Sequence, residues 1–515
     1  MTVLMRLVGR MELSADASQN ADMLNISRIK ANDLFATGVS QSRRSQVATI
    51  TELSVKAHVL EFVITSGTAV RATDALLRFK NLVAQELGPG HKIGVRKVTV
   101  PSLTIEGSPR EMNTDAIKRL VGQTAKVTAT PSMVRVEFSN LTEKDLRVHL
   151  TDKVLRLSAQ KEEVEAESSA TFGAVLQSIK PKDIRFHEDP SKLAEESGWV
   201  VRFPGRGQWI FGPPMLSLVK GIKELIEDEI CRPFGFKEWM FPRLLPMEVY
   251  KKLKTYVEHL PDGVFYVSAP PRDPSVFDEF KREYTLRGQL RTDLLKDILD
   301  EPGYVLDAVQ CPPFYQTFSG RRVDSAELPI KAYDVSSGWT WRNEAGGTEG
   351  LVRTNEFYRM EMAFMGTPKD AQDIRDSLVD ATARLVGNRL DLEWRLVAGA
   401  PFYLSPEEAR QKVIDISSRD KIPTLDVECY LPYRGSRDQA EWLETSAGTV
   451  HRKYYVDAFR IKELHNREIW TGCLGHGLTR LAAAVLSQHG MDFENWPEPL
   501  RKKIGTLPPP IRFAK

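Results

Sequence analysis

Cysteine is scarce in this chain, which carries only four in 515 residues. They are Cys231, Cys311, Cys429 and Cys473, and they lie far apart along the sequence. Widely spaced cysteines do not form the dense disulfide framework that stabilises small secreted domains. We therefore expect the four thiols to be either free, in a reducing compartment, or ligands of a metal ion.

The sequence also lacks a marked excess of charge and any long apolar run. Lys and Arg number 71 and Asp and Glu number 69, so the net charge of +2 does not itself point to a nucleic-acid partner, which would need only a local basic patch. No stretch approaches the length of a membrane span, and the first residues lack the apolar core of a secretory signal. We expect a cytoplasmic protein with no membrane partner.

Length and patterning predict a chain of two to four domains with a separate N-terminal α+β domain over residues 1–165. Alternating apolar residues predict three strands, at 57–64, 97–100 and 133–138. A helical pattern runs over 71–86 and is expected to end near Gly88. The charged segment 160–169 is either a linker or the solvated end of a helix.

Residues 166–515 are expected to form one large catalytic domain. A long amphipathic helix is predicted over 213–230 and a strand over 237–242. Two further helical patterns, joined near Gly288, form a helix-turn-helix insertion at about 262–304. An ordinary helical hairpin is a far commoner reading of this pattern than a DNA reader, so we expect no DNA partner.

A predicted hairpin carries the first candidate site. Arg342 and Glu344 lie two residues apart, so they face the same side of a strand. The Gly-rich turn 345–350 reverses the chain, and the returning strand brings Arg353 and Phe357. A hairpin with charged faces is usually only surface, but two arginines and an aromatic ring suit a nucleoside triphosphate, because arginine binds phosphate and a base stacks on the ring.

A second Gly-rich segment lies nearer the C-terminus. Gly472, Gly475 and Gly477 allow a strand and a helix start to approach a ligand closely, and Arg480 follows at the opening of an apolar helix. A glycine pattern of this kind is weak evidence when it stands alone. Its position after the hairpin gives it weight.

Together these segments resemble the signature motifs of the class II aminoacyl-tRNA synthetases. The hairpin resembles motif 2, the Gly-rich segment resembles motif 3, and residues 212–242 resemble motif 1, which forms the homodimer interface in that family. The resemblance implies that Arg342 clamps the α-phosphate and the substrate carboxylate and that Arg353 holds the γ-phosphate of ATP. It also implies that Phe357 and Arg480 stack on opposite faces of the adenine.

Two of the cysteines fall inside this proposed active site. Cys311 precedes two prolines, Cys473 lies within the motif 3 segment, and Glu361 follows on the return strand of the hairpin. Two thiolates and a carboxylate suit Zn²⁺ with a fourth position left open. The spacing is not that of a recognised zinc motif, so buried, small apolar cysteines are the alternative reading.

The zinc trio, the helical insertion and the N-terminal domain together resemble the methanogenic-type (type 2) seryl-tRNA synthetases. Segments that carry this resemblance include residues 206–210, 308–314, 431–435, 470–473 and 495–498. The resemblance implies that zinc binds the amino group of the substrate, that Glu444 helps to hold the Mg²⁺ of ATP, and that Glu344 lies near the adenine edge or the amino acid. It leaves Cys231 and Cys429 structural.

Three positions depart from the serine-pocket pattern of that family. Phe402 stands where the family has Trp, Pro406 where it has Gln, and Ala447 where it has Asn. A pocket without side chains that bind the substrate hydroxyl loses discrimination for it. The alternative reading is therefore a synthetase paralogue that activates another amino acid, for another tRNA or a non-tRNA acceptor.

The leading reading is ATP-dependent activation of serine and its transfer to tRNA. The N-terminal domain is expected to bind the tRNA through basic side chains, or else these are scattered surface charges. They are Lys80, Arg96, Lys97, Arg110, Lys118 and Arg119. A non-catalytic, synthetase-like protein is disfavoured, because such a protein need not keep Arg342, Arg353, Phe357 and Arg480.

Overall fold

The structure is a computed structural model of the chain. It describes residues 3–36, 39, 41–109, 112, 114–122, 124–142, 145–146, 151, 154, 173–335, 339–343, 348–401, 416–438, 440 and 442–510. Two compact units are present. The first comprises Met1–Ala174, Ala398–Ala400 and Leu404–Pro423, and the second comprises Val175–Val397, Pro401–Tyr403 and Thr424–Lys515. The charged segment 160–169 lies outside the described residues.

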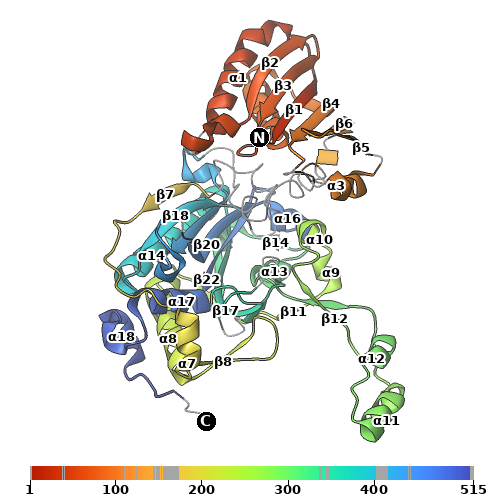
Figure 1. Ribbon diagram of the computed structural model, residues 1–515. Coiled ribbons are helices and arrows are strands. Elements are labelled where there is room, and N and C mark those ends of the chain that lie inside the picture. The colour runs from red at the N-terminus through yellow and green to blue at the C-terminus, as the bar shows by residue number, and fades with distance from the viewer. Residues whose placement is uncertain are drawn as a thin grey trace. The chain divides into compact units, whose positions relative to one another are not determined.

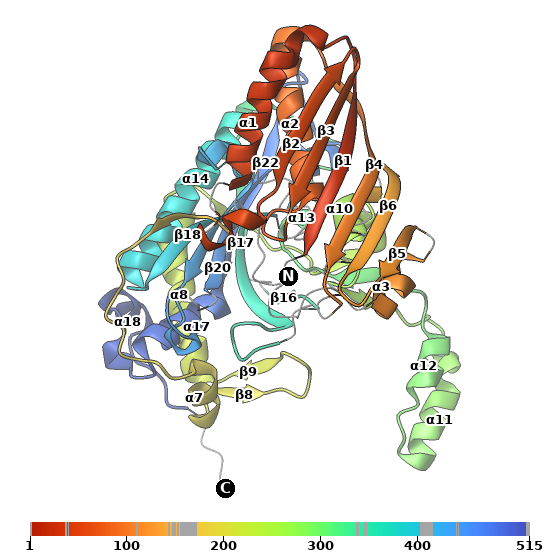
Figure 2. The ribbon, with the colours of Figure 1, turned by 45° about the horizontal axis from the view of Figure 1, so that its top comes forward.

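The first unit is built on a six-stranded antiparallel sheet in the order β2-β3-β1-β4-β6-β5. Its strands are β1 (Leu4–Leu13), β2 (Thr49–Lys56), β3 (Val59–Ser66), β4 (Val95–Gly107), β5 (Ala125–Ala129) and β6 (Val134–Thr142). Its helices are α1 (Ala21–Ala36), α2 (Ala72–His91) and α3 (Thr114–Val121). Figure 2 shows the strands side by side with α1 and α2 against them, as the expected α+β domain requires.

Strand β1 illustrates why this sheet has one buried face. Met5, Leu7 and Met11 alternate with the exposed Arg6 and Arg10, and only the apolar set faces the core. This period of two is the pattern that a half-buried strand requires.

Helix α2 continues past the end that its glycines predict. It runs to His91, and Lys92 then adopts a left-handed conformation whose N–H bonds to the carbonyl of Gly88. The next N–H, of Ile93, bonds to the carbonyl of Leu87, and both of these side chains are buried. The capping bonds and their apolar contact, rather than the glycines, end the helix.

The second unit contains a nine-stranded, mainly antiparallel sheet in the order β10-β15-β17-β22-β20-β19-β18-β7, with β16 also paired to β17. Its central strands are β15 (Ile330–Asp334), β17 (Glu356–Gly366), β22 (Trp470–Gly477), β20 (Leu443–Arg452) and β19 (Thr424–Cys429). The outer strands are β10 (Lys237–Glu238), β16 (Trp339–Trp341), β18 (Trp394–Gly399) and β7 (Val175–Ser178). The predicted fold class is confirmed: an antiparallel sheet flanked by helices forms the larger unit (Figure 1).

The two faces of this sheet differ. Helices α14 (Pro368–Arg384) and α17 (Leu478–His489) pack against one face, and α8 (Pro213–Ile226) packs against α17. A Cβ at Gly448 of β20 would press on Val379 of α14, so residues that face the same way as Gly448 lie under the helices. The opposite face carries Glu361, Gly475 and Ala447, which stand side by side on β17, β22 and β20.

The segments before this sheet partly match the sequence expectations. Helix α8 begins at Pro213 as predicted and continues into a π-helical turn, Glu227–Cys231. The strand expected over 237–242 is wrong beyond Glu238, because only the two residues of β10 pair, with Ala332 and Tyr333 of β15. The loop that follows places the large apolar side chain of Met240 at the surface.

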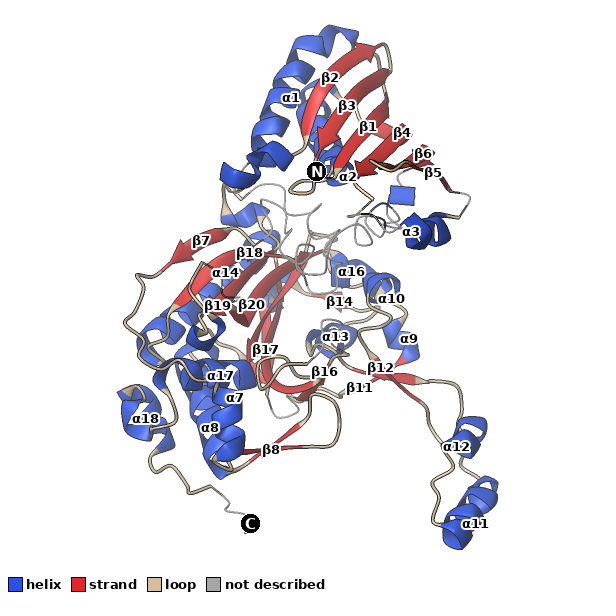
Figure 3. Cartoon of the chain, in the orientation of Figure 1, coloured by secondary structure: helices blue, strands red, loops and turns tan. Residues whose placement is uncertain are grey.

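The helical insertion extends from a small antiparallel sheet of β11 (Leu244–Pro246), β12 (Phe265–Val267) and β13 (Tyr304–Leu306). Helices α11 (Asp278–Arg287) and α12 (Thr292–Ile298) carry no buried residue and project from the second unit (Figure 3). Gly288, in a left-handed conformation, ends α11 where the sequence predicts the turn. Among the residues that the structure describes, no helix is both long and apolar enough to cross a membrane.

Candidate active site

The predicted hairpin is formed by β16 and the first residues of β17. Thr340 faces Phe357 and Trp341 faces Glu356 in an antiparallel register. The N–H of Arg342 bonds to the carbonyl of Asn355 at 2.9 Å, which extends the pairing by one residue. Glu344 and the tip of the turn lie outside the described residues, so the role expected for Glu344 stays a prediction.

Two arginines converge on the ring of Phe357. The guanidinium carbon of Arg342 lies 5.6 Å from the ring centroid, and that of Arg480 lies 5.7 Å from it. Arg342 is oriented by a hydrogen bond from Nε to the carbonyl of Ala308 at 3.1 Å. Phe357 itself is buried. The structure therefore brings together, from three separate segments, the side chains that the sequence assigns to one nucleotide.

Arg353 closes the returning side of the turn. Its N–H bonds to the carbonyl of Glu349, and the two residues form an isolated antiparallel bridge. The carboxylate of Glu349 lies 2.6 Å from Nη2 of Arg434. Arg434 belongs to the 431–435 segment, so this ion pair connects that segment to the hairpin.

Glu444 stands at the edge of the site, where the sequence expects a ligand of Mg²⁺. Its side chain is half-exposed, and a carboxylate oxygen lies 3.8 Å from Nη1 of Arg480. Arg480 also donates a hydrogen bond to the carbonyl of Glu444 at 3.1 Å. Burial, together with Glu444 and Glu428, raises the pKa of the nearby Asp426 carboxyl. This part of β19 and β20 is thus rich in carboxyl groups, a setting that favours a divalent cation.

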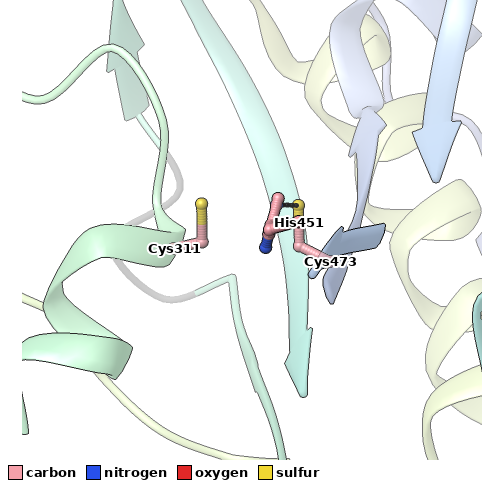
Figure 4. Close-up of side chains that lie close together, drawn as sticks. All are labelled: Cys311, His451 and Cys473. Atoms are coloured by element: carbon pink, nitrogen blue, oxygen red, sulfur yellow. Dashed lines mark hydrogen bonds between the residues drawn. The ribbon is translucent and has the colours of Figure 1, made fainter. Parts of the chain in front are cut away.

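The structure brings two of the proposed zinc ligands together. Cys311, the first residue of α13 (Cys311–Gln316), and Cys473 of β22 lie with His451 in a group whose ligand atoms are all within 4.8 Å of one another (Figure 4). Sγ of Cys473 lies 3.4 Å from Nε2 of His451. All three residues are buried. His451 was not among the ligands predicted from the sequence.

Glu361, the third proposed ligand, lies beside this group on β17. It is fully buried. Glu361 pairs with Gly475 of β22, which lies two residues from Cys473, so Glu361 and Cys473 face the same side of the sheet. Its Oε2 lies 2.7 Å from Nη2 of Arg359, but neither carboxylate oxygen makes a hydrogen bond within the part of the chain that the structure describes. Arg359 lies over Gly475, where a Cβ would overlap its guanidinium. No role was predicted for Arg359, although Arg359 lies two residues from Glu361 just as Arg342 lies two residues from Glu344.

The electrostatics of the group suit a cation. A hydrogen bond with Cys311, burial and the Glu361 carboxylate all raise the pKa of the Cys473 thiol. Burial lowers the pKa of His451 to about 3, so its imidazole is neutral. A divalent ion would give Glu361 Oε1 a partner and would stabilise the thiolates that the present surroundings disfavour. The residues present therefore fit Zn²⁺.

The remaining cysteines lie elsewhere. Cys231 is buried with its Sγ 3.6 Å from Sδ of Met360, and Cys429 is buried with its Sγ 3.7 Å from Oγ1 of Thr445. Burial raises the pKa of both thiols, to about 12 for Cys429. Neither is placed to bind substrate. Of the three departures in the serine pocket, Phe402 and Pro406 lie outside the described residues.

Ala447, the third departure, stands between Gly475 of β22 and Asp426 of β19. Its small side chain faces the same side of the sheet as Glu361 and Cys473. The amino-acid side of the site therefore has no bulky group at this position.

Comparisons with known proteins cover both units. A model of a tRNA-binding domain matches residues 3–160. A model of the tRNA synthetase class II core domain (G, H, P, S and T) matches residues 295–489.

Curated relatives match over nearly the whole chain. The type-2 serine–tRNA ligase of Methanopyrus kandleri is 37% identical over 92% of this chain and 90% of its own length. Those of Methanococcus maripaludis and Methanocaldococcus jannaschii are 33% and 34% identical over 98% of this chain, and over 98% and 96% of their own lengths.

Solved structures show the same similarity. The M. kandleri SerRS in complex with A. aeolicus tRNASec matches with a TM-score of 0.62 and 35% identity, over 100% of this chain and 99% of that one. The cytoplasmic serine–tRNA ligase of Naegleria fowleri in complex with AMP matches with a TM-score of 0.50 at 13% identity, over 70% of this chain and 74% of that one, which is a likeness of fold alone.

Proposed function

This chain belongs to the family of type-2 serine–tRNA ligases, and we propose that it activates serine with ATP and transfers the seryl group to the 3′ end of a tRNA. The observation that carries this proposal is the convergence of Arg342 and Arg480 on Phe357, on the strand that also holds Glu361. Nucleotide and amino acid would then bind next to each other along β17, and adenylate formation requires the two substrates to be adjacent.

In the first step, the serine carboxylate attacks the α-phosphorus of ATP in line with the departing pyrophosphate. Arg342 would align the carboxylate and stabilise the negative charge that develops on the phosphorus oxygens. Arg353 would hold the γ-phosphate, and Phe357 and Arg480 would hold the adenine between them. Glu344, which is assigned from the sequence alone, would contact the adenine edge or the amino acid.

In the second step, a ribose hydroxyl of the terminal tRNA nucleotide attacks the seryl carbonyl carbon, and AMP departs with the electron pair of the mixed-anhydride bond. The match of residues 3–160 to a tRNA-binding domain supports a role for the first unit in holding this tRNA. Glu444 would hold the Mg²⁺ that accompanies ATP, because hard cations prefer carboxylate oxygens.

We assign the zinc ligands as Cys311, Glu361 and Cys473, with one position open for the substrate amine. When bound there, Zn²⁺ would supply a Lewis acid that binds an α-amino group and so selects amino acids. Arg359 holds Glu361 in place by their ion pair. The unpartnered Oε1 of Glu361 supports the assignment, because a buried carboxylate oxygen without a partner is costly unless a cation or donor joins it.

We further propose a homodimer in the cytoplasm. Large apolar side chains are exposed within the motif 1 segment, at Leu216 and Met240, and just beside it, at Ile210 and Leu244, and a second copy would cover them. Two-fold pairing through this region would bury them.

Exchange of labelled pyrophosphate into ATP, measured with each of the twenty amino acids in turn, tests the proposal. We expect serine alone to support exchange and the seryl group to appear on tRNA. Exchange with a different amino acid would favour the altered-substrate reading that Ala447 motivates. Absence of exchange with all twenty would contradict both enzymatic readings.

A further inference from the structure

Each thiol of the proposed zinc site has one further polar neighbour within the second unit. Oη of Tyr455 lies 3.4 Å from Sγ of Cys311, and Nε2 of His451 lies 3.4 Å from Sγ of Cys473. Oη of Tyr256 lies 2.6 Å from Oη of Tyr455. All five residues are buried. The chain therefore surrounds the two sulfurs with a fixed polar shell rather than with apolar side chains alone.

The deprotonated state of a metal-bound thiolate fixes which tyrosine hydroxyl donates and which accepts a hydrogen bond. A metal-bound sulfur of Cys311 carries no proton, so it can only accept a hydrogen bond. Tyr455 must then donate its hydroxyl proton to the sulfur, and its oxygen accepts from Tyr256. Zinc binding thus orients a chain from Tyr256 to Tyr455 to Cys311.

Packing fixes the Tyr455 ring in this position. Tyr315 stacks on it with centroids 4.5 Å apart, and the rings of His451 and Tyr454 lie steeply inclined to it with centroids 4.8 and 4.9 Å away. Tyr455 lies on the short helix α16 (Tyr454–Ala458), and Tyr256 lies on α10 (Lys254–His259). A ring enclosed in this way has little freedom to move its hydroxyl away from the sulfur.

The surroundings of His451 suit an imidazole that donates a hydrogen bond to Cys473 better than one that binds the metal ion. An imidazole that binds a metal usually donates its second N–H to a carbonyl or carboxylate, which fixes its orientation. Nδ1 of His451 is buried and has no hydrogen-bond partner. A neutral ring with its proton on Nε2 can donate to Cys473 and leaves only an unused lone pair on Nδ1, whereas a ring ligated through Nε2 would bury an unpaired N–H.

We propose that Tyr455 and His451 are positioning residues that donate hydrogen bonds to the two zinc thiolates, Tyr455 to Cys311 and His451 to Cys473. The bonds stabilise the deprotonated sulfurs and hold their lone pairs toward the ion. They also draw electron density from sulfur, which leaves the ion a stronger acceptor for the substrate amine. This inference rests on the proposed function, because it concerns the thiolates of that zinc site.

Zinc affinity of the full-length protein, measured by competition with a chromogenic chelator, tests the proposal without using catalysis. We expect Tyr455→Phe and His451→Gln each to weaken zinc binding about 10- to 100-fold, the range for loss of such outer-shell partners. Tyr256→Phe is expected to weaken it less and in the same direction. Tyr250→Phe is the matched control, because its buried hydroxyl bonds to the carbonyl of Tyr256 and reaches neither sulfur.

Cobalt substitution gives a second readout that a general loss of folding would not produce. In Tyr455→Phe and His451→Gln, the sulfur-to-cobalt charge-transfer bands should move to longer wavelength, because a sulfur without its hydrogen bond gives up electron density more readily. The weaker ligand-field bands should keep the same tetrahedral intensity. X-ray absorption should show two sulfur ligands and no loss of a nitrogen ligand in His451→Gln.

The outcomes separate this inference from the proposed function. A wild-type protein that binds no zinc contradicts the metal assignment and this inference together. Zinc binding and cobalt spectra that are indifferent to Tyr455→Phe contradict this inference alone. Loss of a nitrogen ligand in His451→Gln would make His451 a direct ligand and contradict its role as a donor.

Discussion

The guanidinium of Arg359 lies directly over the backbone of Gly475, and a side-chain carbon at Gly475 would overlap its Nη2, Cζ and Nε. The same Nη2 lies 2.7 Å from the Glu361 carboxylate. Gly475 does not adopt the left-handed backbone that favours glycine, so its lack of a side chain serves to make room for Arg359.

Gly475→Ala should therefore impair amino-acid activation more than stability. The methyl group displaces the Arg359 guanidinium and breaks its ion pair with Glu361, so we expect kcat/KM for serine in pyrophosphate exchange to fall about 10- to 100-fold, as misplacement of a positioning group by about 1 Å does. The KM for ATP should change little. Gly303→Ala is the control, because nothing lies within 4 Å of a Cβ there. Equal losses in both variants would contradict the explanation.

Arg342→Lys should reduce kcat although the charge is retained. A lysine cannot form the planar, two-pronged contact with phosphate and carboxylate, and it loses the Nε bond to Ala308. We expect kcat in pyrophosphate exchange to fall about 100- to 1,000-fold, the range for loss of a group that stabilises transition-state charge. A wild-type kcat in this variant would show that Arg342 does not contact the reacting phosphate.

Cys311→Ser should remove zinc and activity together. A serine hydroxyl is a poor zinc ligand at neutral pH, so the variant should retain much less than one zinc per chain when measured by atomic emission. Exchange activity should fall in proportion to metal content. Cys231→Ser is the matched control at a buried cysteine away from the group, and it should keep its zinc. Full exchange by a zinc-free Cys311→Ser protein would contradict the metal assignment.

The nucleotide side of this site could be predicted from the sequence, and the metal side only in part. Arg342, Phe357 and Arg480 converge as their motifs indicate, because strand pairing and a helix start fix their directions. His451 belongs to no recognised motif and was not predicted, although alternation from Ala447 along β20 places it on the face that also holds Cys473.

Tyr455 could not be foreseen either, because its contact with Cys311 depends on how α16 packs beside α13, which no local pattern specifies. The unexpected length of α2 has a similar origin. Gly88 and its neighbours usually end a helix, but α2 continues to His91, where the N–H of Ile93 bonds to the carbonyl of Leu87 and caps it. Local patterns thus predicted some of the strands, such as those within β3, β4 and β6, whereas contacts between elements decided the rest.

Asp307→Asn should change how stability depends on pH. Burial raises the pKa of the Asp307 carboxyl to about 6, although Arg243, 3.7 Å away, acts in the opposite direction. The folded state therefore keeps a proton between pH ~4 and ~6 that the unfolded state has released, so this group's contribution to stability falls as pH rises through that window. The full effect corresponds to about 3 kcal/mol at pH 7.

Calorimetric melting of wild type and Asp307→Asn at pH 5 and pH 7.5 checks this sign. The asparagine keeps an oxygen to accept the N–H of Val309, so the fold should be preserved. Between pH 5 and pH 7.5, the melting temperature of the wild type should fall relative to that of the variant. A relative gain by the wild type would mean that the Arg243 pairing dominates and that the pKa of Asp307 is lowered.

The exposed pair Arg96 and Lys97 at the start of β4 should contact tRNA phosphates. Of the other basic residues expected to do so, Lys118 is exposed on α3, whereas Arg110 lies outside the described residues. In a double Arg96→Ala, Lys97→Ala variant, tRNA affinity should fall at every salt concentration. The slope of log affinity against log salt should become shallower by about one unit per lost contact.

Serine-dependent pyrophosphate exchange should be unchanged in this variant, because the substitutions lie in the first unit and adenylation occurs in the second. Lys502→Ala, an exposed lysine on α18 (Glu498–Ile504) of the second unit, is the matched control and should leave both the affinity and the slope at wild-type values. If the double variant binds tRNA with an unchanged slope, Arg96 and Lys97 are ordinary surface charges. The tRNA-binding surface of the first unit would then have to be sought around Lys118 on α3.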